Sequence, residues 1–321
     1  MNHDDVTRGL LRSVSRTFYL SIRILPAELR EAMGVAYLLA RTSDTIADSE
    51  AAAVSVRLRR LEEFGKMLHT GASQQFIGYI QREIRPTHEG DRALIAAMPL
   101  VLSRFGAFRP WEWKETIELL TNIIQGQSND LRTFSDPEKI AALPDAYSLE
   151  DYAYLVAGCV GEWWTRMSYH HFSRYSNRTE EELMPLAASF GKALQLVNIL
   201  RDMPADLRAG RCYLPADELQ SAGTDPASLS DDPSVAQPVF DAWMAKAGAF
   251  LDEGRDYIRA IRPWRVRFAC YVPWRLAKQT LALMAAKPPL LSAEKVKVSR
   301  MMVYGTMLRG LVAAFTNFPL R

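Results

Sequence analysis

Hydrophobic residues recur at intervals of three and four along most of this chain. Between residues 29 and 47, for example, Met33, Ala36, Tyr37 and Ala40 would lie on one face of a helix. The strict alternation of hydrophobic and polar residues that is typical of strands is nearly absent. The pattern predicts helices over 29–47, 54–68, 92–105, 113–126, 152–172, 183–201, 240–261 and 296–315.

Residues that interrupt helices lie between these segments, at 86–90, Pro110, 135–144 and Pro263. The longest break, 223–238, is polar and contains prolines, so we expect it to be a loop. No internal repeat and no shift in composition marks a domain boundary. We therefore predict one all-α domain that covers residues 1–321 and contains roughly eight to eleven helices.

The composition excludes several classes of protein. With 48% hydrophobic and 24% charged residues, the 321-residue chain resembles an ordinary globular protein. Its net charge of +2 argues against a nucleic-acid-binding protein that depends on bulk charge. No run reaches the ~18 apolar residues of a membrane-spanning helix, and the first residues lack the features of a signal peptide. We expect a soluble, cytoplasmic protein, and attachment to a membrane surface stays open.

The cysteines and histidines give no sign of a zinc site. Cys159, Cys212 and Cys270 are far apart and lack C-x-x-C spacing, so we expect buried, reduced thiols. The histidines are scattered except for His170 and His171, which would point to different sides of a helix. The glycine-rich motifs of Rossmann and P-loop nucleotide-binding proteins are also absent.

Two pairs of aspartates are the strongest chemical signal. Asp44 and Asp48 are four residues apart, as are Asp202 and Asp206, and this spacing places each pair on one face of a helix. Such pairs most often lie on a solvated face. Here both pairs follow long apolar stretches, so we expect buried helices, in which carboxylates need partners or a metal ion. Mg²⁺ binds carboxylate oxygens and readily bridges to substrate phosphates.

The second pair has a proline, Pro204, between its two aspartates. Proline lacks an N–H group and clashes with the preceding turn, so we expect Pro204 to kink or end the helix. In this interpretation Asp202 is held by the last turn of the helix. Asp206 is then placed by the chain that leaves it.

Arginines and aromatic residues accompany the aspartates. Arginine binds phosphate through two parallel hydrogen bonds, and the arginines that flank the motifs are Arg16, Arg41, Arg201, Arg208 and Arg211. Aromatic rings can stabilise the carbocation that remains when a phosphate group leaves. Core packing is the alternative role for each aromatic candidate, and these are Phe18, Tyr19, Tyr37, Tyr152, Tyr154, Trp163, Trp164 and Tyr213.

At these residues the chain resembles the squalene/phytoene synthase family of head-to-head prenyl synthases. The similar segments are SRTFYLSIRILP (15–26), YLLARTSDTIAD (37–48), YLVAGCVGE (154–162) and QLVNILRDMPADLRAGRCYLP (195–215). The resemblance extends over about residues 10 to 285. It implies an all-α isoprenoid-synthase fold with a central apolar cavity, and a prenyltransferase activity.

The resemblance also implies a reaction. Two farnesyl diphosphates would bind with Mg²⁺ and condense head to head to presqualene diphosphate, which squalene synthases reduce to squalene with NADPH. Squalene synthase is our first interpretation. The alternatives are an enzyme that makes presqualene diphosphate, dehydrosqualene or phytoene without NADPH, and a family member that acts as a scaffold. We expect a monomer or weak homodimer without nucleic-acid partners, and peripheral contact with a membrane for product release stays open.

The family's functional residues map onto this chain by position. Mg²⁺ would be held by Asp44, Asp48, Asp202 and Asp206. Diphosphate would be bound by the segment that begins with Ser15, Arg16 and Phe18, and by Arg41, Arg201, Arg211 and Tyr213. Tyr37 and Tyr152 would steer ionisation and proton transfer, and Gln195 and Asn198 would line the cavity.

Two further segments bear on the product. The block 262–281 resembles squalene synthases more than phytoene synthases, and the basic stretch 294–300 offers Lys295, Lys297 and Arg300 to NADPH. The chain also departs from the family pattern. Ala47 and Ala205 stand where many members have acids, and Leu155 stands where tyrosine is frequent.

Overall fold

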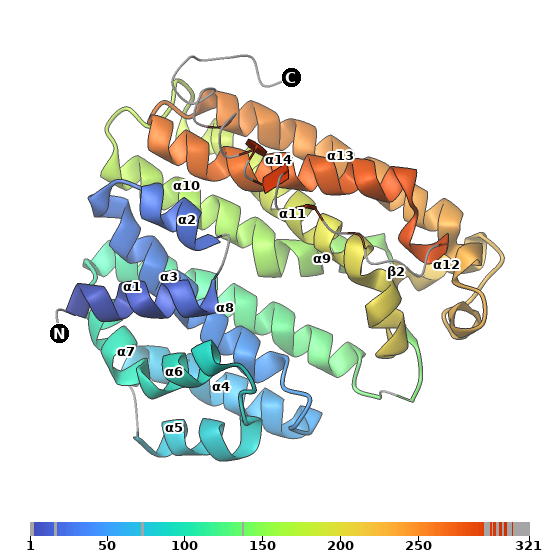
Figure 1. Ribbon diagram of the computed structural model, residues 1–321, viewed down its shortest axis with the longest axis horizontal. Helices are drawn as coiled ribbons and strands as arrows, with labels where there is room; N and C mark the ends of the chain where they lie inside the picture. Colours follow the sequence, from blue (N-terminus) through green and yellow to red (C-terminus); the bar gives the residue numbers. More distant parts are fainter. Residues whose placement is uncertain are drawn as a thin grey trace. The chain divides into compact units, whose positions relative to one another are not determined.

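The computed structural model describes residues 3–15, 18–71, 74–136, 138–291, 296, 298–299, 302–303, 305–306 and 310. Helices dominate this part of the chain, as the periodicity predicts (Figure 1). Contacts divide the chain into two compact units, residues 1–132 and residues 133–321. The expectation of one domain around a central cavity stays a prediction.

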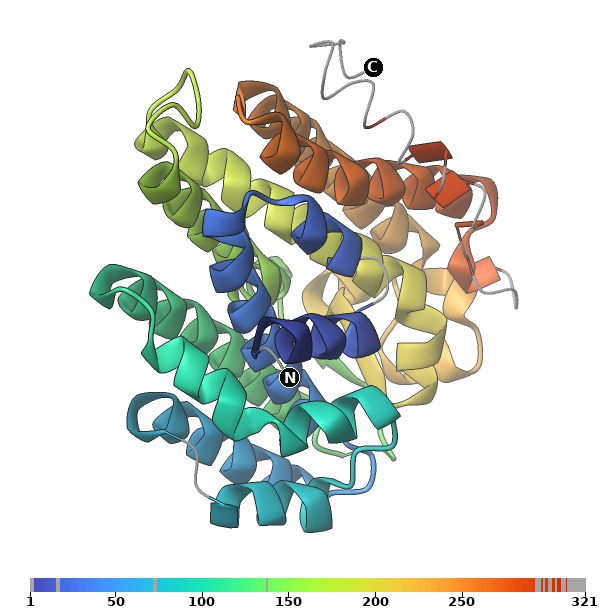
Figure 2. The same ribbon diagram turned by 60° about the vertical axis from the view of Figure 1, so that its left-hand side comes forward.

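The first unit is built around the long helix α3 (Ala27–Ala47), which contacts α1, α2, α4, α6 and α7. Val35, Leu38, Leu39 and Ile46 of α3 are fully buried, because their spacing of three, one and seven keeps them on the inner side. The other elements are α1 (His3–Val14), α2 (Phe18–Ile24), α4 (Val54–Thr70), α5 (Gln74–Tyr79), the π-helix η1 (Ile80–Ile84), α6 (Glu89–Ala96), α7 (Met98–Gly106) and α8 (Pro110–Thr133). Figure 2 shows α1 beside α6, in agreement with their contacts.

The second unit is built around α11 (Glu180–Arg208), which packs against α10, α13 and α14 (Figure 1). A capping box begins α11: Glu182 N–H donates to Thr179 Oγ1, and Thr179 N–H donates to Glu182 Oε2. The other elements are β1 (Ala141–Leu143), α9 (Ala146–Ala153), the π-helix η2 (Tyr154–Gly158), α10 (Cys159–His171), β2 (Arg211–Pro215), α12 (Ala216–Ser221), the 3₁₀ turns η3 (Ala227–Ser230) and η4 (Pro233–Ala236), α13 (Gln237–Ala260), α14 (Trp264–Ala286) and η5 (Pro289–Leu291).

Glycines let α11 approach its neighbours at backbone distance. A Cβ atom on Gly191 would lie 2.1 Å from the carbonyl oxygen of Ala157, and one on Gly161 would lie 2.1 Å from that of Ala187. No side chain fits there, so η2 and α10 pack directly on the α11 backbone. This close packing fixes the helix that carries the second aspartate pair.

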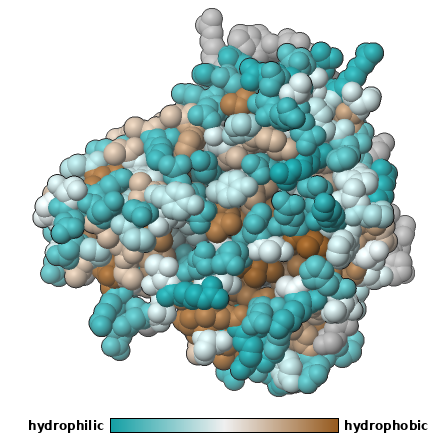
Figure 3. Space-filling view, turned by 180° about the vertical axis from the view of Figure 1, so that it is seen from behind, coloured by the Kyte–Doolittle hydropathy of each residue, from teal (hydrophilic) through white to brown (hydrophobic). Residues whose placement is uncertain are grey.

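Hydropathy alone would admit α11 as a membrane span. It is the one described helix that is long and apolar enough, yet 61% of its apolar window is buried inside the protein. The core helix of a globular protein has the same properties. Figure 3 shows a face on which hydrophilic residues predominate, and hydrophobic residues gather in its lower part.

Several sequence predictions need correction. The helix predicted over 92–105 is two helices, because Pro99 cannot continue α6 and the chain turns at Ala97. The segment 152–172 is interrupted by η2, and 135–144 contains β1, which pairs in parallel with β2. The described residues also contain more helices than the eleven expected, since several are short. Most of the helix predicted over 296–315 lies outside the described residues.

Pro204 and Pro273 lie inside helices, at positions where the sequence analysis predicted no helix. An end of the helix at Pro204 is wrong, because α11 runs on to Arg208. A kink at Pro204 stays a prediction. Met203 and Leu207 are buried on either side of Pro204, so packing holds this last turn. Helix α14 was not predicted, although Pro263 only caps its start and Pro273 lies within it.

The three cysteines are free and buried, as predicted. Burial raises the pKa of Cys159 and of Cys212 to about 12, and it raises the pKa of Cys270 further. These thiols therefore stay protonated at neutral pH.

Candidate active site

The first acidic motif lies on the C-terminal half of α3. Tyr37, Arg41, Asp44 and Asp48 follow one another at intervals of four, three and four residues, so they share one side of the helix. Asp48 is the C-cap residue, and its backbone N–H donates to the carbonyl oxygen of Asp44 at 2.8 Å. Asp44 is partly buried and Asp48 is exposed, which corrects the expectation that both are buried.

Asp44 has an unusual environment for a carboxylate. Burial, with a contribution from the charge of Asp48, raises the pKa of Asp44 to about 7. Arg41 and a hydrogen bond from Gln127 act in the opposite direction. The Gln127 side-chain amide donates to Asp44 Oδ1 at 2.7 Å from helix α8. A positive ion beside Asp44 would relieve the cost of ionising it.

Gln127 places a second side-chain oxygen beside Asp44, and the sequence analysis did not identify this residue. Its Oε1 atom is buried and has no hydrogen-bond partner in the described part of the chain. A buried acceptor without a partner is costly unless a ligand, ion or water satisfies it. Carboxylate and amide oxygens are ligand types that Mg²⁺ accepts, so these residues fit that ion. Sequence offered only one hint, an additional polar residue on an amphipathic helix.

The carboxylates do not form a complete metal cage. Among the described residues, no group of three or more His, Cys, Asp and Glu side chains could hold a metal ion. Mg²⁺ commonly takes one or two protein carboxylates and completes its shell with water and substrate phosphates. A pair of aspartates in each motif agrees with that mode of binding.

Arg41 is held in a fixed orientation. Its Nε and Nη2 atoms donate to Oδ1 and Oδ2 of Asp91 at 2.9 Å each, and the hydrogen bonds raise the pKa of Arg41. Only 8% of the Asp91 side chain is exposed. Such a two-bond pair orients the guanidinium strongly. Asp91, on α6, is a second functional candidate that the motif search did not find.

Tyr37 contacts the segment before α2. Its hydroxyl donates to the carbonyl oxygen of Val14 at 3.4 Å and also hydrogen-bonds the Ser15 side chain, while burial raises the pKa of Tyr37. Ser15 is buried and accepts a bond from the backbone N–H of Tyr19 at 3.0 Å. Arg16 lies outside the described residues, and Phe18 is the first residue of α2.

The second acidic motif occupies the end of α11. Arg201 donates to both carboxylate oxygens of Asp202, at 3.1 and 2.5 Å, and Arg211 donates to Asp206 Oδ1 at 2.9 Å. Each aspartate is therefore paired with an arginine from its own motif. Because phosphate binds both magnesium and arginine, these ion pairs can exchange partners when a diphosphate arrives.

Aromatic rings gather next to this motif. Tyr213, on β2, stacks on Tyr152 with ring centroids 5.2 Å apart and meets Phe134 edge-on at 5.1 Å. The second unit thus brings Tyr152 and Tyr213 together, and Tyr213 lies two residues from Arg211. Gln195 is partly buried on α11, whereas Asn198 is exposed.

The remaining candidates from the sequence have no described contact with the two acidic motifs or lie outside the described residues. Tyr154 donates to Glu162 Oε2 at 3.0 Å, and burial raises the pKa of Tyr154 to about 12. Arg208 is exposed at the end of α11. The NADPH candidates Lys295, Lys297 and Arg300 lie outside the described residues, so their role stays a prediction.

The family model described as squalene/phytoene synthase matches residues 11–302. The chain belongs to this family. Its relatives are prenyltransferases that join prenyl chains head to head, so the protein is an enzyme of this class with the all-α isoprenoid-synthase fold.

Individual relatives of the squalene/phytoene synthase family differ in their products. The chain is 26% identical to squalene synthase ERG9 of Candida albicans, over 96% of this chain and 69% of that protein. It is 28% identical to the presqualene diphosphate synthase of Zymomonas mobilis, over 92% of this chain and 89% of that protein. The solved complex of TcSQS with the ligand E5700 has a TM-score of 0.78 at 21% identity, covering 98% of this chain and 89% of that one. These identities do not separate the products.

Proposed function

We propose that the enzyme condenses two molecules of farnesyl diphosphate head to head to form presqualene diphosphate. The supporting observation is the pair of acidic motifs with their own arginines: Asp44 near the fixed Arg41, and Asp202 and Asp206 bonded to Arg201 and Arg211. This combination suits diphosphate and Mg²⁺ and has no evident use in packing alone.

The proposed reaction breaks one bond and forms a ring. One farnesyl diphosphate loses its diphosphate group and leaves an allylic cation. The double bond of the second molecule attacks this cation, and loss of a proton closes a cyclopropane ring. The products are presqualene diphosphate, inorganic diphosphate and one proton.

Residues of this chain would divide the work. Arg41, held by Asp91, presents a fixed guanidinium to the leaving diphosphate. Tyrosine is protonated at neutral pH, and burial raises the pKa of Tyr37 further, so its hydroxyl can donate a hydrogen bond to a diphosphate oxygen. The stacked rings of Tyr152 and Tyr213 offer their faces to developing positive charge.

The metal site is part of the same proposal. Asp44, Asp48, Asp202 and Asp206 would hold Mg²⁺, and the orphan oxygen of Gln127 would face the ion or one of its waters. When bound, Mg²⁺ supplies positive charge that stabilises the departing diphosphate.

Reduction to squalene with NADPH is the second candidate function. It is favoured by the resemblance of residues 262–281 to squalene synthases and by the basic stretch 294–300. We further propose a cytoplasmic enzyme, a monomer or weak homodimer, whose contact with membranes serves product release.

The test is to incubate the purified enzyme with farnesyl diphosphate and Mg²⁺, with and without NADPH, and to identify products by mass spectrometry. Presqualene diphosphate in both reactions, without squalene, supports the first half-reaction alone. Squalene that forms only with NADPH supports the full sequence, and Lys297→Ala should then slow reduction but spare condensation. Dehydrosqualene would move the enzyme to another branch, as would phytoene formed from a longer prenyl diphosphate, and no product from any prenyl diphosphate would contradict the proposal.

A further inference from the structure

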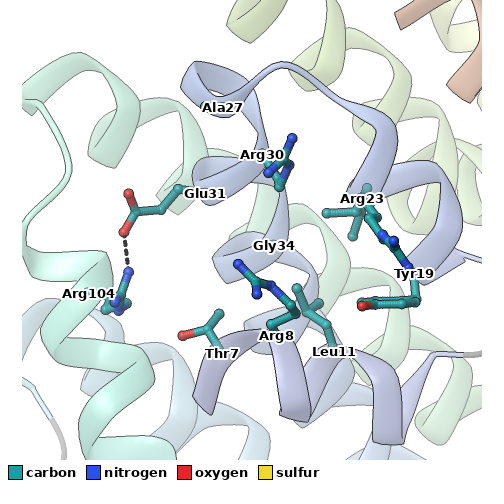
Figure 4. A pocket seen from close by; sticks show the side chains of 11 residues that line it. Thr7, Arg8, Leu11, Tyr19, Arg23, Ala27, Arg30, Glu31, Gly34 and Arg104 are labelled. Atoms are coloured by element: carbon teal, nitrogen blue, oxygen red, sulfur yellow. Dashed lines mark hydrogen bonds and ion pairs between the residues drawn. The ribbon is translucent and has the colours of Figure 1, made fainter. Parts of the chain in front are cut away.

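A pocket lined by arginines lies in the first unit, beside the N-terminal half of α3. It is a pocket of about 720 Å³ between helices α1, α2, α3 and α7. Its described lining includes four arginines, one from each helix: Arg8, Arg23, Arg30 and Arg104 (Figure 4). The acidic motif occupies the other half of α3, and no residue of that motif lines this pocket.

Arginines outnumber carboxylates among the described residues that line the pocket. Glu31 is the one carboxylate among its described lining residues, and Arg104 donates to it at 2.6 Å. Arg23 is exposed and makes no hydrogen bond or ion pair with the described part of the chain. Like charges that converge on one opening repel one another, so an anion in the pocket would lower the energy of this arrangement.

One arginine of the pocket, Arg30, is held in place by the backbone. The Nε and Nη2 atoms of Arg30 donate to the carbonyl oxygen of Leu25 at 3.2 and 2.7 Å, which fixes this guanidinium. Its remaining N–H groups have no acceptor among the described residues, so they can bind a ligand. An arginine already held in place loses less conformational entropy when it binds phosphate.

The pocket is also lined by apolar side chains. Leu11 of α1 and Ile22 of α2 are buried, and Tyr19 stands beside them. Leu11 approaches α3 closely, since a Cβ on Gly34 would lie 3.0 Å from its Cδ1 atom. Arginines and apolar side chains that line one pocket suit a ligand that carries phosphate at one end and an apolar group at the other.

We propose that this pocket is an accessory binding site for a phosphate or diphosphate ester with an apolar chain. The same chemistry occurs in a free prenyl diphosphate and in the headgroup region of an anionic phospholipid. The inference does not rest on the proposed function, because it uses none of the aspartates of the two motifs.

The test compares Arg23→Gln with the wild type. Binding of inorganic pyrophosphate is measured by titration calorimetry in EDTA, so that magnesium-dependent binding elsewhere is suppressed. Loss of one charge-assisted contact should weaken binding about tenfold. A parallel arm measures co-sedimentation with phosphatidylcholine vesicles that contain or lack phosphatidic acid. Arg23 is exposed, so its replacement should leave the melting temperature unchanged.

Two more variants separate a ligand site from a loss of general charge. Arg59→Gln removes an exposed arginine on α4, outside the pocket lining, and should bind both probes like the wild type. Glu31→Gln removes the competing carboxylate and should tighten binding several-fold, a gain that destabilisation cannot produce.

The two arms identify the source of the ligand. Weaker pyrophosphate binding by Arg23→Gln supports a free diphosphate, and weaker binding only to vesicles with phosphatidic acid supports a lipid headgroup. Equal behaviour of Arg23→Gln and Arg59→Gln in both arms would overturn the accessory site. Condensation of farnesyl diphosphate is measured separately, so either proposal can fail without the other.

Discussion

In the folded protein, ionisation of the Asp44 carboxyl group costs free energy. Its pKa is about 7 in the folded protein and 3.8 in its ordinary state, and the causes are burial and then the charge of Asp48. As pH rises from about 4, the unfolded chain releases this proton before the folded protein does. Without metal, the free energy of unfolding should therefore fall by up to about 1.4 kcal/mol per pH unit until about pH 7, then level off.

The comparison with Asp44→Asn isolates this effect from the neighbouring Arg41, Asp48 and Asp91, which stay the same. In EDTA at about pH 8, Asp44→Asn should be more stable than the wild type, and below about pH 4 the difference should vanish. Urea unfolding followed by circular dichroism over a pH series measures the free energy of unfolding of the wild type and of Asp44→Asn. A difference in stability that does not change with pH would disprove the assignment.

Gln127 should matter for metal binding because it connects to Asp44 and carries a buried oxygen without a described partner. We expect Gln127→Leu to weaken Mg²⁺ binding by about tenfold to hundredfold, as loss of an outer partner typically does. The readout is the rise of melting temperature with Mg²⁺, measured beside the rate of condensation.

Gln125→Leu is the matched control, since Gln125 is exposed on the same helix and bonds Asn129 instead. It should bind Mg²⁺ like the wild type. If Gln127→Leu also keeps its full Mg²⁺ response, Gln127 has no part in the metal site.

The residues that local spacing could predict differ from those it could not. Asp44 and Arg41 follow from a motif on one helix, and a family resemblance assigns their roles. Their partners Gln127 and Asp91 lie 83 and 50 residues away in sequence. No helical period links such distant positions, so only tertiary packing could reveal them.

At the scale of elements, close contact between backbones is the feature that holds α11. Gly191→Ala would place a Cβ 2.1 Å from the carbonyl oxygen of Ala157, so part of η2 or α11 must move. Overpacking a well-packed interior costs about 1–3 kcal/mol, and a clash with backbone falls at the upper end or beyond. We therefore expect a large loss of stability in urea unfolding.

Gly248→Ala on α13 is the control for helix propensity. A Cβ there meets nothing within 4 Å, and alanine favours a helix over glycine by about 0.5–1 kcal/mol. This variant should be unchanged or slightly more stable. Equal stability of the two variants would show that the α11 packing yields without cost.

Long amphipathic helices were predictable as elements, and their interruptions were not. The helices α3, α4, α11 and α13 follow the hydrophobic period within a few residues, except at the end of α11. The π-helix η2 has no signature in that period, because it keeps the helical direction and only widens one turn. Helix α14 was not predicted, and the sequence analysis treats only Pro263, before it, as a break. Pro273 lies inside the helix, where buried residues on both sides of it hold the helix together.

At the scale of the whole molecule, each compact unit carries one acidic pair, with Asp44 in the first and Asp202 in the second. Under the proposed function both pairs serve the same ionisation step. Asp44→Asn and Asp202→Asn should therefore each reduce condensation by at least about a thousandfold, the range seen when one member of a catalytic unit is removed.

The double variant Asp44→Asn/Asp202→Asn tests whether the two aspartate pairs act on the same reaction step. When residues work on one step, removal of the first leaves little for the second to contribute, so losses do not multiply. The double variant should be no more than about tenfold slower than the slower single variant. Asp252→Asn, which alters a partly buried carboxylate on α13 that pairs with Lys278, should keep full activity and control for the loss of one acidic charge outside both motifs. Losses that multiply would mean that the two pairs act on separate steps, and the proposal of a shared ionisation would then be wrong.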